Sequence, residues 1–351
     1  MNARAGSIRE LRKTMNARAG SIHRPNGLVD PYGRKINYLR ISVTDRCNLR
    51  CRYCVPGKIR RQDRDGELLS YEDLFRIGRA SVSLGIEKIR VTGGEPLLRP
   101  GITGFLSRLG GIPGLRNLVV TTNGVNLERM AEGLAAAGVR GINISCDSLR
   151  PGVYARITRG GDARRVFAGI AAAERTGFPS LKINVVVMRG VNCEEIPDFA
   201  ALTLEKPYAV RFIEYMPTAG VRERAPLLVT GSEIVARIAK RFPLSRLTGE
   251  DQGGPARRYK IPGAAGTIGL ITPRSCSFCV ECSRIRVSAA GIARSCLFSA
   301  EGMDLRPVLV SGDDTRLEET LRGIVSRKPA GHALSLEESA RLPFSMSQMG
   351  G

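Results

Sequence analysis

The chain has no tryptophan, and aromatic residues make up only 5% of its 351 positions. Proteins that bind single-stranded nucleic acid stack the bases on aromatic side chains, so this scarcity argues against such a platform. No apolar run of about 18 residues occurs, and the start of the chain lacks the apolar segment of a secretory signal. Nine cysteines, an odd number, argue against a disulfide scaffold. We therefore expect a cytoplasmic protein with reduced thiols and no membrane partner.

Acidic residues are also in the minority, because 33 aspartates and glutamates face 54 lysines and arginines, which gives a formal net charge of +21. This charge either serves solubility or attracts an anionic partner, such as a nucleoside triphosphate or a nucleic acid. The arginine-rich segment Met1–Ile8 recurs identically at Met15–Ile22. We expect residues 1–37 to form a disordered basic tail that carries this duplication.

Histidine is rare as well, whereas cysteine is concentrated. The two histidines are His23 and His332, and three cysteines fall within the eight residues CNLRCRYC, from Cys47 to Cys54. Thiolates at this spacing suit zinc or an iron–sulfur cluster, and inert buried cysteines are the plainer alternative. A structural zinc site needs a fourth ligand, which no nearby histidine supplies. A cluster held by three thiolates leaves one iron open, and we place the chemistry there.

From Tyr38 onward, expected strands and helices alternate about every thirty residues. The expected strands are 39–44, 88–92, 118–121, 141–145, 181–187 and 209–213, and helices are expected at 71–84, 102–109, 127–137, 163–176 and 194–203. This alternation predicts an α/β fold, an incomplete (β/α)6 TIM-like barrel over residues 38–224, with its working groups after the strands' carboxyl ends. A helix at 231–241 and short strands near 258–261, 266–271 and 284–288 predict a smaller α+β domain over residues 225–351.

The second expected strand ends in the tetrapeptide Gly93-Gly94-Glu95-Pro96. Successive glycines allow a ligand to approach the main chain closely, and Glu95 offers an acceptor to an ammonium group. A tight turn before a helix explains the same four residues without any ligand. The tetrapeptide gains weight only because it lies in the same predicted barrel as the three-cysteine segment.

A second group of cysteines lies near the end of the chain: Cys276, Cys279, Cys282 and Cys296. Four thiolates can close a tetrahedral zinc site, and the overlapping C-x2-C steps do not select three ligands from the four. Arg284 and Arg286 follow at alternate strand positions, so they point to one face. Paired guanidiniums suit a phosphate group, although a solvated strand face is the alternative.

Eight segments, in this order, resemble the GTP 3′,8-cyclase family of the radical S-adenosylmethionine (SAM) superfamily: LRISVTDRCNLRCRYC, RVTGGEPLLR, TTNG, NISCDSL, KINVVVM, RFIEYMP, FCVECSRIRVSAAG and CLF. The resemblance runs from about Tyr38 to Gly351 and implies a barrel of the radical SAM type. It implies conversion of GTP to (8S)-3′,8-cyclo-7,8-dihydroguanosine 5′-triphosphate, the first step of molybdenum cofactor biosynthesis. A 5′-deoxyadenosyl radical derived from SAM would take the ribose 3′ hydrogen, and C3′ would then add to C8 of guanine.

The resemblance also implies roles for residues at matching positions. The first [4Fe-4S] cluster would be held by Cys47, Cys51 and Cys54. Contacts to SAM would come from Tyr53, Gly94, Ser145 and Met216. Contacts to GTP would come from Arg40, Arg90, Thr121, Lys182, Arg284, Ile285 and Arg286. A second [4Fe-4S] cluster, which faces the guanine, would be held by Cys279, Cys282 and Cys296. The catalytic tail would be Gly350 and Gly351, a frayed end on the residues alone, and Cys146 and Cys276 would be bystanders.

The implied partners are GTP, a one-electron donor such as flavodoxin or ferredoxin, and cyclic pyranopterin monophosphate synthase downstream. No nucleic-acid partner is implied, and the protein would be a monomer or homodimer. Two other hypotheses remain open. One is a radical SAM peptide maturase with an auxiliary cluster, and the other is a basic RNA-binding protein held together by zinc.

Overall fold

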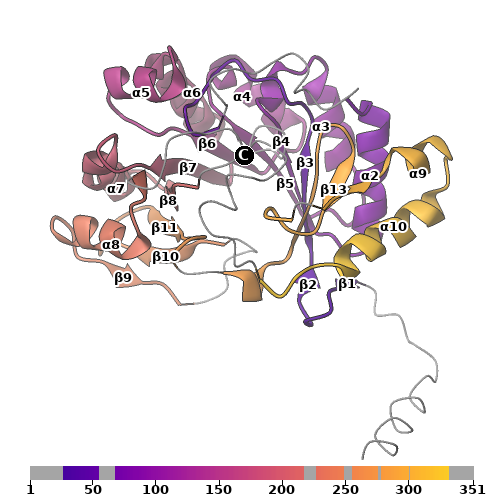
Figure 1. Ribbon diagram of the computed structural model, residues 1–351. Coiled ribbons are helices and arrows are strands. Elements are labelled where there is room, and N and C mark those ends of the chain that lie inside the picture. The colour runs from indigo at the N-terminus through magenta and orange to yellow at the C-terminus, as the bar shows by residue number, and fades with distance from the viewer. Residues whose placement is uncertain are drawn as a thin grey trace, which may run out of the picture.

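A computed structural model describes residues 27–54, 68–216, 227–248, 255–275, 278–299 and 301–331. The duplicated segment, Cys276 and the pair Gly350 and Gly351 lie outside these ranges. The described residues form a curved sheet with helices packed around it (Figure 1). No helix within these ranges is both long enough and apolar enough to cross a lipid bilayer.

Six parallel strands form the middle of the sheet: β3 (Tyr38–Ser42), β4 (Lys88–Thr92), β5 (Asn117–Thr122), β6 (Gly141–Ser145), β7 (Ser180–Val187) and β8 (Ala209–Glu214). They are adjacent in chain order, and all six match the predicted strands. Apolar residues such as Leu39, Ile41 and Ile89 are fully buried at alternate positions on the helix-facing side. The intervening positions face the inside of the curve, where polar side chains are found.

The carboxyl-terminal part of the chain extends this sheet at both edges. β12 (Arg284–Val287) pairs in parallel with β3, and β11 (Thr267–Ile271) pairs in parallel with β8. Antiparallel strands continue outward: β13 (Ile292–Arg294), β14 (Met303–Asp304), β10 (Arg257–Lys260) and β9 (Ser245–Arg246). Among the described residues the sheet therefore has twelve strands in one open order, as an incomplete barrel requires. The expected division at residues 224 and 225 stays a prediction, because the hydrogen-bonded ladder runs across it.

The helices on the outside follow the strands: α2 (Tyr71–Ser83), α3 (Ile102–Gly110), α4 (Leu127–Ala136), α6 (Ala163–Thr176), α7 (Ile196–Glu205) and α8 (Gly231–Ala239). These six were predicted. Three more were not: α5 (Pro151–Thr158), α9 (Arg306–Val310) and α10 (Asp314–Ser326). Ser70 caps α2, since the Asp73 main-chain N–H donates to Ser70 Oγ at 3.0 Å.

The expectation of a disordered tail over residues 1–37 is wrong for its last part. Residues 28–36 form a hairpin of two short strands, β1 (Leu28–Val29) and β2 (Lys35–Ile36). The side chains of Leu28 and Ile36 are 2% and 0% exposed, and the hairpin lies beside α10 (Figure 1). Two buried apolar residues anchor this segment, which its basic composition does not reveal.

Candidate active site

A cavity of about 260 Å³ opens at the carboxyl ends of the parallel strands. Predicted site residues from both parts of the chain line it: Arg40, Cys47, Cys51, Tyr53, Cys54, Arg90, Gly94, Thr121, Ser145, Met216, Cys279, Cys282, Arg284, Arg286 and Cys296. Two predicted residues lie elsewhere. Lys182 is two positions before the lining residue Asn184 on β7, and Ile285 is buried on the opposite face of β12 from its arginine neighbours.

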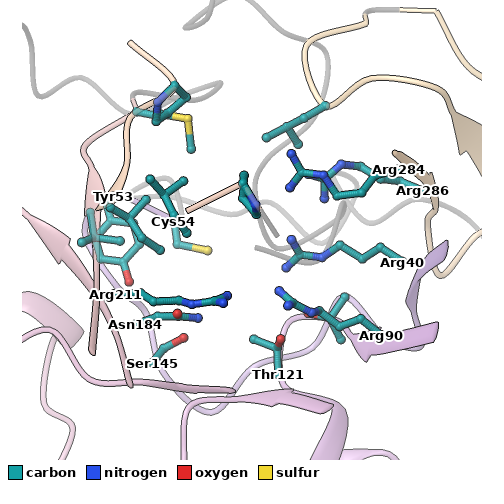
Figure 2. A pocket seen from close by; sticks show the side chains of 18 of the residues that line it. Arg40, Tyr53, Cys54, Arg90, Thr121, Ser145, Asn184, Arg211, Arg284 and Arg286 are labelled. Carbon is teal, nitrogen blue, oxygen red and sulfur yellow. The ribbon is translucent and has the colours of Figure 1, made fainter. Parts of the chain in front are cut away.

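Three arginines form a row across neighbouring strands on one wall of the cavity. Arg286 of β12 is in register with Arg40 of β3, which is in register with Arg90 of β4. Parallel strands are about 4.8 Å apart, so the three side chains are immediate neighbours and point into the same space (Figure 2). Arg284 lies beside them on the same strand face as Arg286. We call Arg40, Arg90, Arg284 and Arg286 the arginine wall.

The arginine wall crowds several positive charges into a buried part of the cavity. Arg40 and Arg286 are 8% and 7% exposed. Burial, reinforced by Arg286 and Arg90, lowers the pKa of Arg40 well below its usual value, and burial with Arg284 lowers the pKa of Arg286 to about 10. Arg286 Nη1 and Arg90 Nε are buried without a hydrogen-bond partner in the described residues. Both the crowding and these donors favour an anionic ligand.

The opposite wall carries Tyr53, Ser145, Asn184 and Arg211 (Figure 2). The Tyr53 hydroxyl donates to Asp147 Oδ2 at 2.7 Å, and the Val186 main-chain N–H donates to Asp147 Oδ1 at 2.8 Å. Burial raises the pKa of Asp147 to about 6, although these two donors oppose that rise. Asp147 therefore fixes the aromatic residue of the three-cysteine segment against β7.

Asn184 and Arg211 were missed by the sequence analysis. They are in register on β7 and β8, and Ser145 of β6 is in register with Asn184. A signal was present, because Asn184 is two positions after Lys182 and Arg211 lies in the RFIEYMP segment. Strand alternation alone would have placed both side chains on the inner face.

The three-cysteine segment packs against the loop that follows β4. The Gly94 N–H donates to the Thr44 carbonyl at 2.7 Å, and the Glu95 N–H donates to the Arg46 carbonyl at 2.8 Å. A Cβ atom at Gly94 would lie only 2.4 Å from that Arg46 carbonyl oxygen. Glycine is therefore required here by a close approach of two main chains, which presents Cys47 to the cavity.

Glu95 has a different role from the expected acceptor for an ammonium group. Its side chain belongs to a residue that is 1% exposed and outside the cavity lining. Thr122 Oγ1 donates to Oε1 at 2.8 Å, and the Asn123 and Leu97 main-chain N–H groups donate at 2.7 and 3.0 Å. Burial raises the pKa of Glu95 to about 7, against the effect of these three donors. Glu95 thus joins the loops after β4 and β5.

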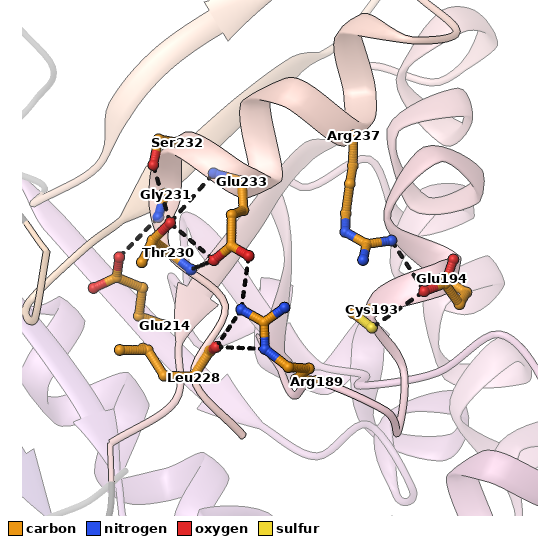
Figure 3. A network of polar contacts seen from close by, with 10 residues as sticks. All are labelled: Arg189, Cys193, Glu194, Glu214, Leu228, Thr230, Gly231, Ser232, Glu233 and Arg237. Atoms are coloured by element: carbon orange, nitrogen blue, oxygen red, sulfur yellow. Dashed lines mark hydrogen bonds and ion pairs between the residues drawn. The ribbon is translucent and has the colours of Figure 1, made fainter. Parts of the chain in front are cut away.

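Glu214, at the end of β8, fixes the chain that leads to the second group of cysteines. Its Oε2 atom accepts from the Arg274 and Ser275 main-chain N–H groups at 2.9 and 3.0 Å. Its Oε1 atom accepts from the Gly231 N–H at 2.8 Å, at the start of α8 (Figure 3). The carboxylate is fully buried and lines the cavity. It therefore holds β8, α8 and the loop after β11 together at the cavity rim.

The six predicted thiol ligands differ in their environments. Burial raises the pKa of Cys47, and it raises the pKa of Cys51 well above its usual value. Burial also opposes ionisation of Cys282, but Arg284 and Lys328 outweigh it and lower the pKa of that thiol to about 7. Within the ranges that the structure describes, no three histidine, cysteine, aspartate or glutamate side chains meet in metal-ligand geometry.

Comparisons with known proteins follow the two parts of the chain. Residues 41–203 match the family model described as Radical SAM superfamily, and residues 208–334 match the one described as Molybdenum Cofactor Synthesis C. The GTP 3′,8-cyclase of Geobacter sulfurreducens is 53% identical over 92% of this chain and 99% of its own length. The GTP 3′,8-cyclase of Gloeobacter violaceus is 44% identical over 90% of this chain and 99% of its own length.

The chain belongs to the GTP 3′,8-cyclase family. The predicted family is thereby confirmed, and the chain is a radical SAM enzyme. The structure of Streptococcus suis SuiB bound to S-adenosylmethionine superposes with a TM-score of 0.54 and 14% identity, over 90% of this chain and 78% of SuiB. At this identity the likeness concerns the fold alone, and it confirms the partial barrel of the radical SAM type.

The first group of cysteines fits the iron–sulfur cluster of this GTP 3′,8-cyclase family member. Cys47, Cys51 and Cys54 all line the cavity, and soft thiolates are the ligands that such clusters prefer. Gly94, which packs directly against this segment, also lines the cavity.

Proposed function

We propose that this protein is a GTP 3′,8-cyclase, a lyase that forms (8S)-3′,8-cyclo-7,8-dihydroguanosine 5′-triphosphate from GTP in the first step of molybdenum cofactor biosynthesis. One observation supports the substrate most directly. The arginine wall and the three-cysteine segment line opposite parts of one cavity. A nucleoside triphosphate that is anchored by its phosphates to the wall would extend its ribose and base toward the cluster site.

The arginine wall would bind the triphosphate. Arg40, Arg90 and Arg286 offer forked donors from three strands, and Arg284 adds a fourth cation at the rim. Thr121 lines the same cavity from β5 and would donate its hydroxyl to the nucleotide. Lys182 would contribute from deeper on β7, and Ile285 through its main chain between the two arginines.

The other wall would bind SAM. Tyr53 and Ser145 belong to it, Gly94 and Met216 line the same cavity, and Asp147 holds Tyr53 in place. When bound, a reduced cluster with SAM supplies a radical that can take hydrogen from a ribose carbon. The protein's part is to orient the two ligands and to exclude water, and buried walls suit that task.

Several finer assignments belong to the same proposal. A second [4Fe-4S] cluster would be held by Cys279, Cys282 and Cys296 and would face the guanine. The Gly350 and Gly351 tail, outside the described residues, would enter the site. A flavodoxin or ferredoxin would supply electrons in the cytoplasm, and cyclic pyranopterin monophosphate synthase would use the product. The protein would act as a monomer or homodimer.

The test is anaerobic reconstitution followed by iron counting and a turnover assay. Two clusters correspond to about eight irons per chain, and we expect 5′-deoxyadenosine to form in a GTP-dependent manner. Cys51→Ser should lose the first cluster and all SAM cleavage. Cys193→Ser is the matched control, because that buried cysteine lies outside the cavity lining. If 5′-deoxyadenosine forms equally well with and without GTP, the peptide maturase is favoured. A colourless protein that contains zinc would refute both the cyclase and the maturase.

A further inference from the structure

Two buried cations lie behind the second group of cysteines, outside the residues that line the cavity. Lys328, shortly after α10, is 3% exposed. The Arg34 side chain, in the turn of the β1–β2 hairpin, is 9% exposed. Burial of a cation is costly unless its donors find partners, so the partners of these two side chains indicate their purpose.

Lys328 holds the main chain beside two of the three cysteines. Its Nζ donates to the Arg284 carbonyl at 2.8 Å and to the Ser295 carbonyl at 2.6 Å. Arg284 is two residues after Cys282, and Ser295 immediately precedes Cys296. The ammonium also lies close enough to both thiols to interact with their charges. One side chain therefore ties together the strands that present these two cysteines.

Arg34 holds the third cysteine. Its Nη1 donates to the Cys279 carbonyl at 2.6 Å and to the Ala330 carbonyl at 3.0 Å, and its Nη2 donates to the Pro329 carbonyl at 2.5 Å. The buried carboxylate of Asp30 accepts from Arg34 Nε and fixes the guanidinium. The amino-terminal hairpin is thereby joined to the cysteine segment and to the chain beside Lys328.

The two cations differ in what balances their charge. Arg34 has a carboxylate partner in Asp30. The Lys328 ammonium donates to two neutral carbonyl oxygens and lies close to Cys282 and Cys296, so a negatively charged group held by these cysteines would balance its charge. A positive charge close to an iron–sulfur cluster stabilises the reduced form, which is the more negative one.

We propose that Lys328 and Arg34 are positioning residues that brace the second group of cysteines, and that the Lys328 charge raises the reduction potential of the cluster held there. This inference rests on the proposed second cluster. It assigns a function to the amino-terminal hairpin, which precedes both matched family models, and to a lysine outside the cavity.

The charge is tested by a redox titration followed by electron paramagnetic resonance, in the full-length chain carrying Cys51→Ser so that only the second cluster reports. Lys328→Gln keeps N–H donors for the carbonyls but removes the charge, and we expect a more negative midpoint potential with iron content retained. Lys328→Arg should stay near the unaltered value. Lys206→Gln, at an exposed ion pair with Glu174, is the control. A midpoint for Lys328→Gln that equals the control would overturn the proposed charge effect.

The brace is tested by the rate at which a chelator removes iron from the second site. Loss of charge-assisted hydrogen bonds in Arg34→Met should speed this release about tenfold or more, while SAM cleavage at the first cluster continues. Arg108→Met, which removes an exposed ion pair with Glu72, is the matched control. If Arg34→Met and the control variant release iron at equal rates, the bracing role of Arg34 is refuted, whereas the proposed second cluster is not. If the unaltered chain loads no iron at the second group, the two-cluster proposal fails and the brace fails with it.

Discussion

At the scale of single residues, the arginine wall places like charges close together, and these charges repel one another. Two unit charges about 5 Å apart, at an effective dielectric constant of about 20, repel each other by roughly 3 kcal/mol. Arg286, Arg40 and Arg90 are in register on adjacent strands, and the first two are nearly inaccessible to water. An anion that accepts from all three would offset this repulsion, which is why we propose the wall as a preformed phosphate site.

We expect Arg286→Ala to weaken GTP binding by about tenfold to a hundredfold, since a hydrogen bond to a charged group contributes about 1.5–3 kcal/mol. Isothermal titration calorimetry measures the affinity, and iron content checks that the clusters remain. Arg164→Ala is the control, because Arg164 is 84% exposed and pairs with Asp162 on the surface. Unchanged affinity in Arg286→Ala would show that the phosphates bind elsewhere.

Glu95 should make the folded state less stable as pH rises. Burial raises its pKa from 4.5 to about 7, so the folded protein holds this proton more tightly than the unfolded chain does. The resulting stabilisation is complete below pH 4.5 and is lost as pH rises to about 7. Glu95→Gln cannot titrate and should show a flatter dependence. Urea unfolding from pH 5 to pH 8 compares the slopes, and parallel curves would contradict the assignment.

The residue scale also shows where reasoning from sequence reached its limit. Cysteine spacing singled out Cys47, strand alternation oriented Arg286, and the family resemblance supplied Arg40; all three line one cavity. The burial of Glu95 was not visible, because its partners Thr122 and Asn123 lie 27 and 28 residues away at the end of β5, which only the parallel pairing of β4 and β5 brings near. Hydrogen bonds that a buried carboxylate accepts from distant parts of the chain leave no pattern in the local sequence.

At the scale of elements, the loops after β3 and β4 act as one unit because their main chains are in contact at Gly94. We expect Gly94→Ala to push these loops apart, since its Cβ would lie 2.4 Å from a main-chain oxygen that cannot rotate away. The predicted cost is about 1–3 kcal/mol of stability together with loss of the first cluster. Thermal unfolding and iron content are the measurements.

The matched control is Gly104→Ala in α3. A Cβ there meets nothing within 4 Å, and alanine favours a helix over glycine by roughly 0.5–1 kcal/mol. This variant should therefore be slightly more stable and keep its iron. If the two glycine variants behave alike, the close approach at Gly94 has no consequence for the cluster.

Most elements with strong periodicity were predicted, and the short strands expected near 258–261, 266–271 and 284–288 correspond to β10, β11 and β12. The helix α10 and the two-residue strands were missed. The six central strands and six helices matched because apolar residues recur at the period that each element requires. The hairpin at residues 28–36 escaped, because strands of two residues carry too few positions for a pattern. Its stability comes from Leu28 and Ile36 packing against distant parts of the chain, which propensity does not report.

At the scale of the whole molecule, the two regions that match different family models share one sheet. β12 covers the outer edge of β3, and β11 covers the outer edge of β8. We expect a chain truncated after residue 216 to aggregate, because two long strands would expose unpaired hydrogen-bonding edges. Size-exclusion chromatography and far-ultraviolet circular dichroism test this. A folded, monomeric fragment would instead support an independent first domain ending near residue 224.

The pairing of β12 with β3 links substrate recognition to correct assembly. A slip of one residue in that pairing would turn Arg284 and Arg286 away from the cavity and put Ile285 and Val287 in their place. A chain mispaired in this way would still bury much of its apolar surface, but we expect that it would not bind GTP. Retention on a GTP-coated resin would therefore separate correctly paired molecules from mispaired ones, which a measurement of compactness alone would not distinguish.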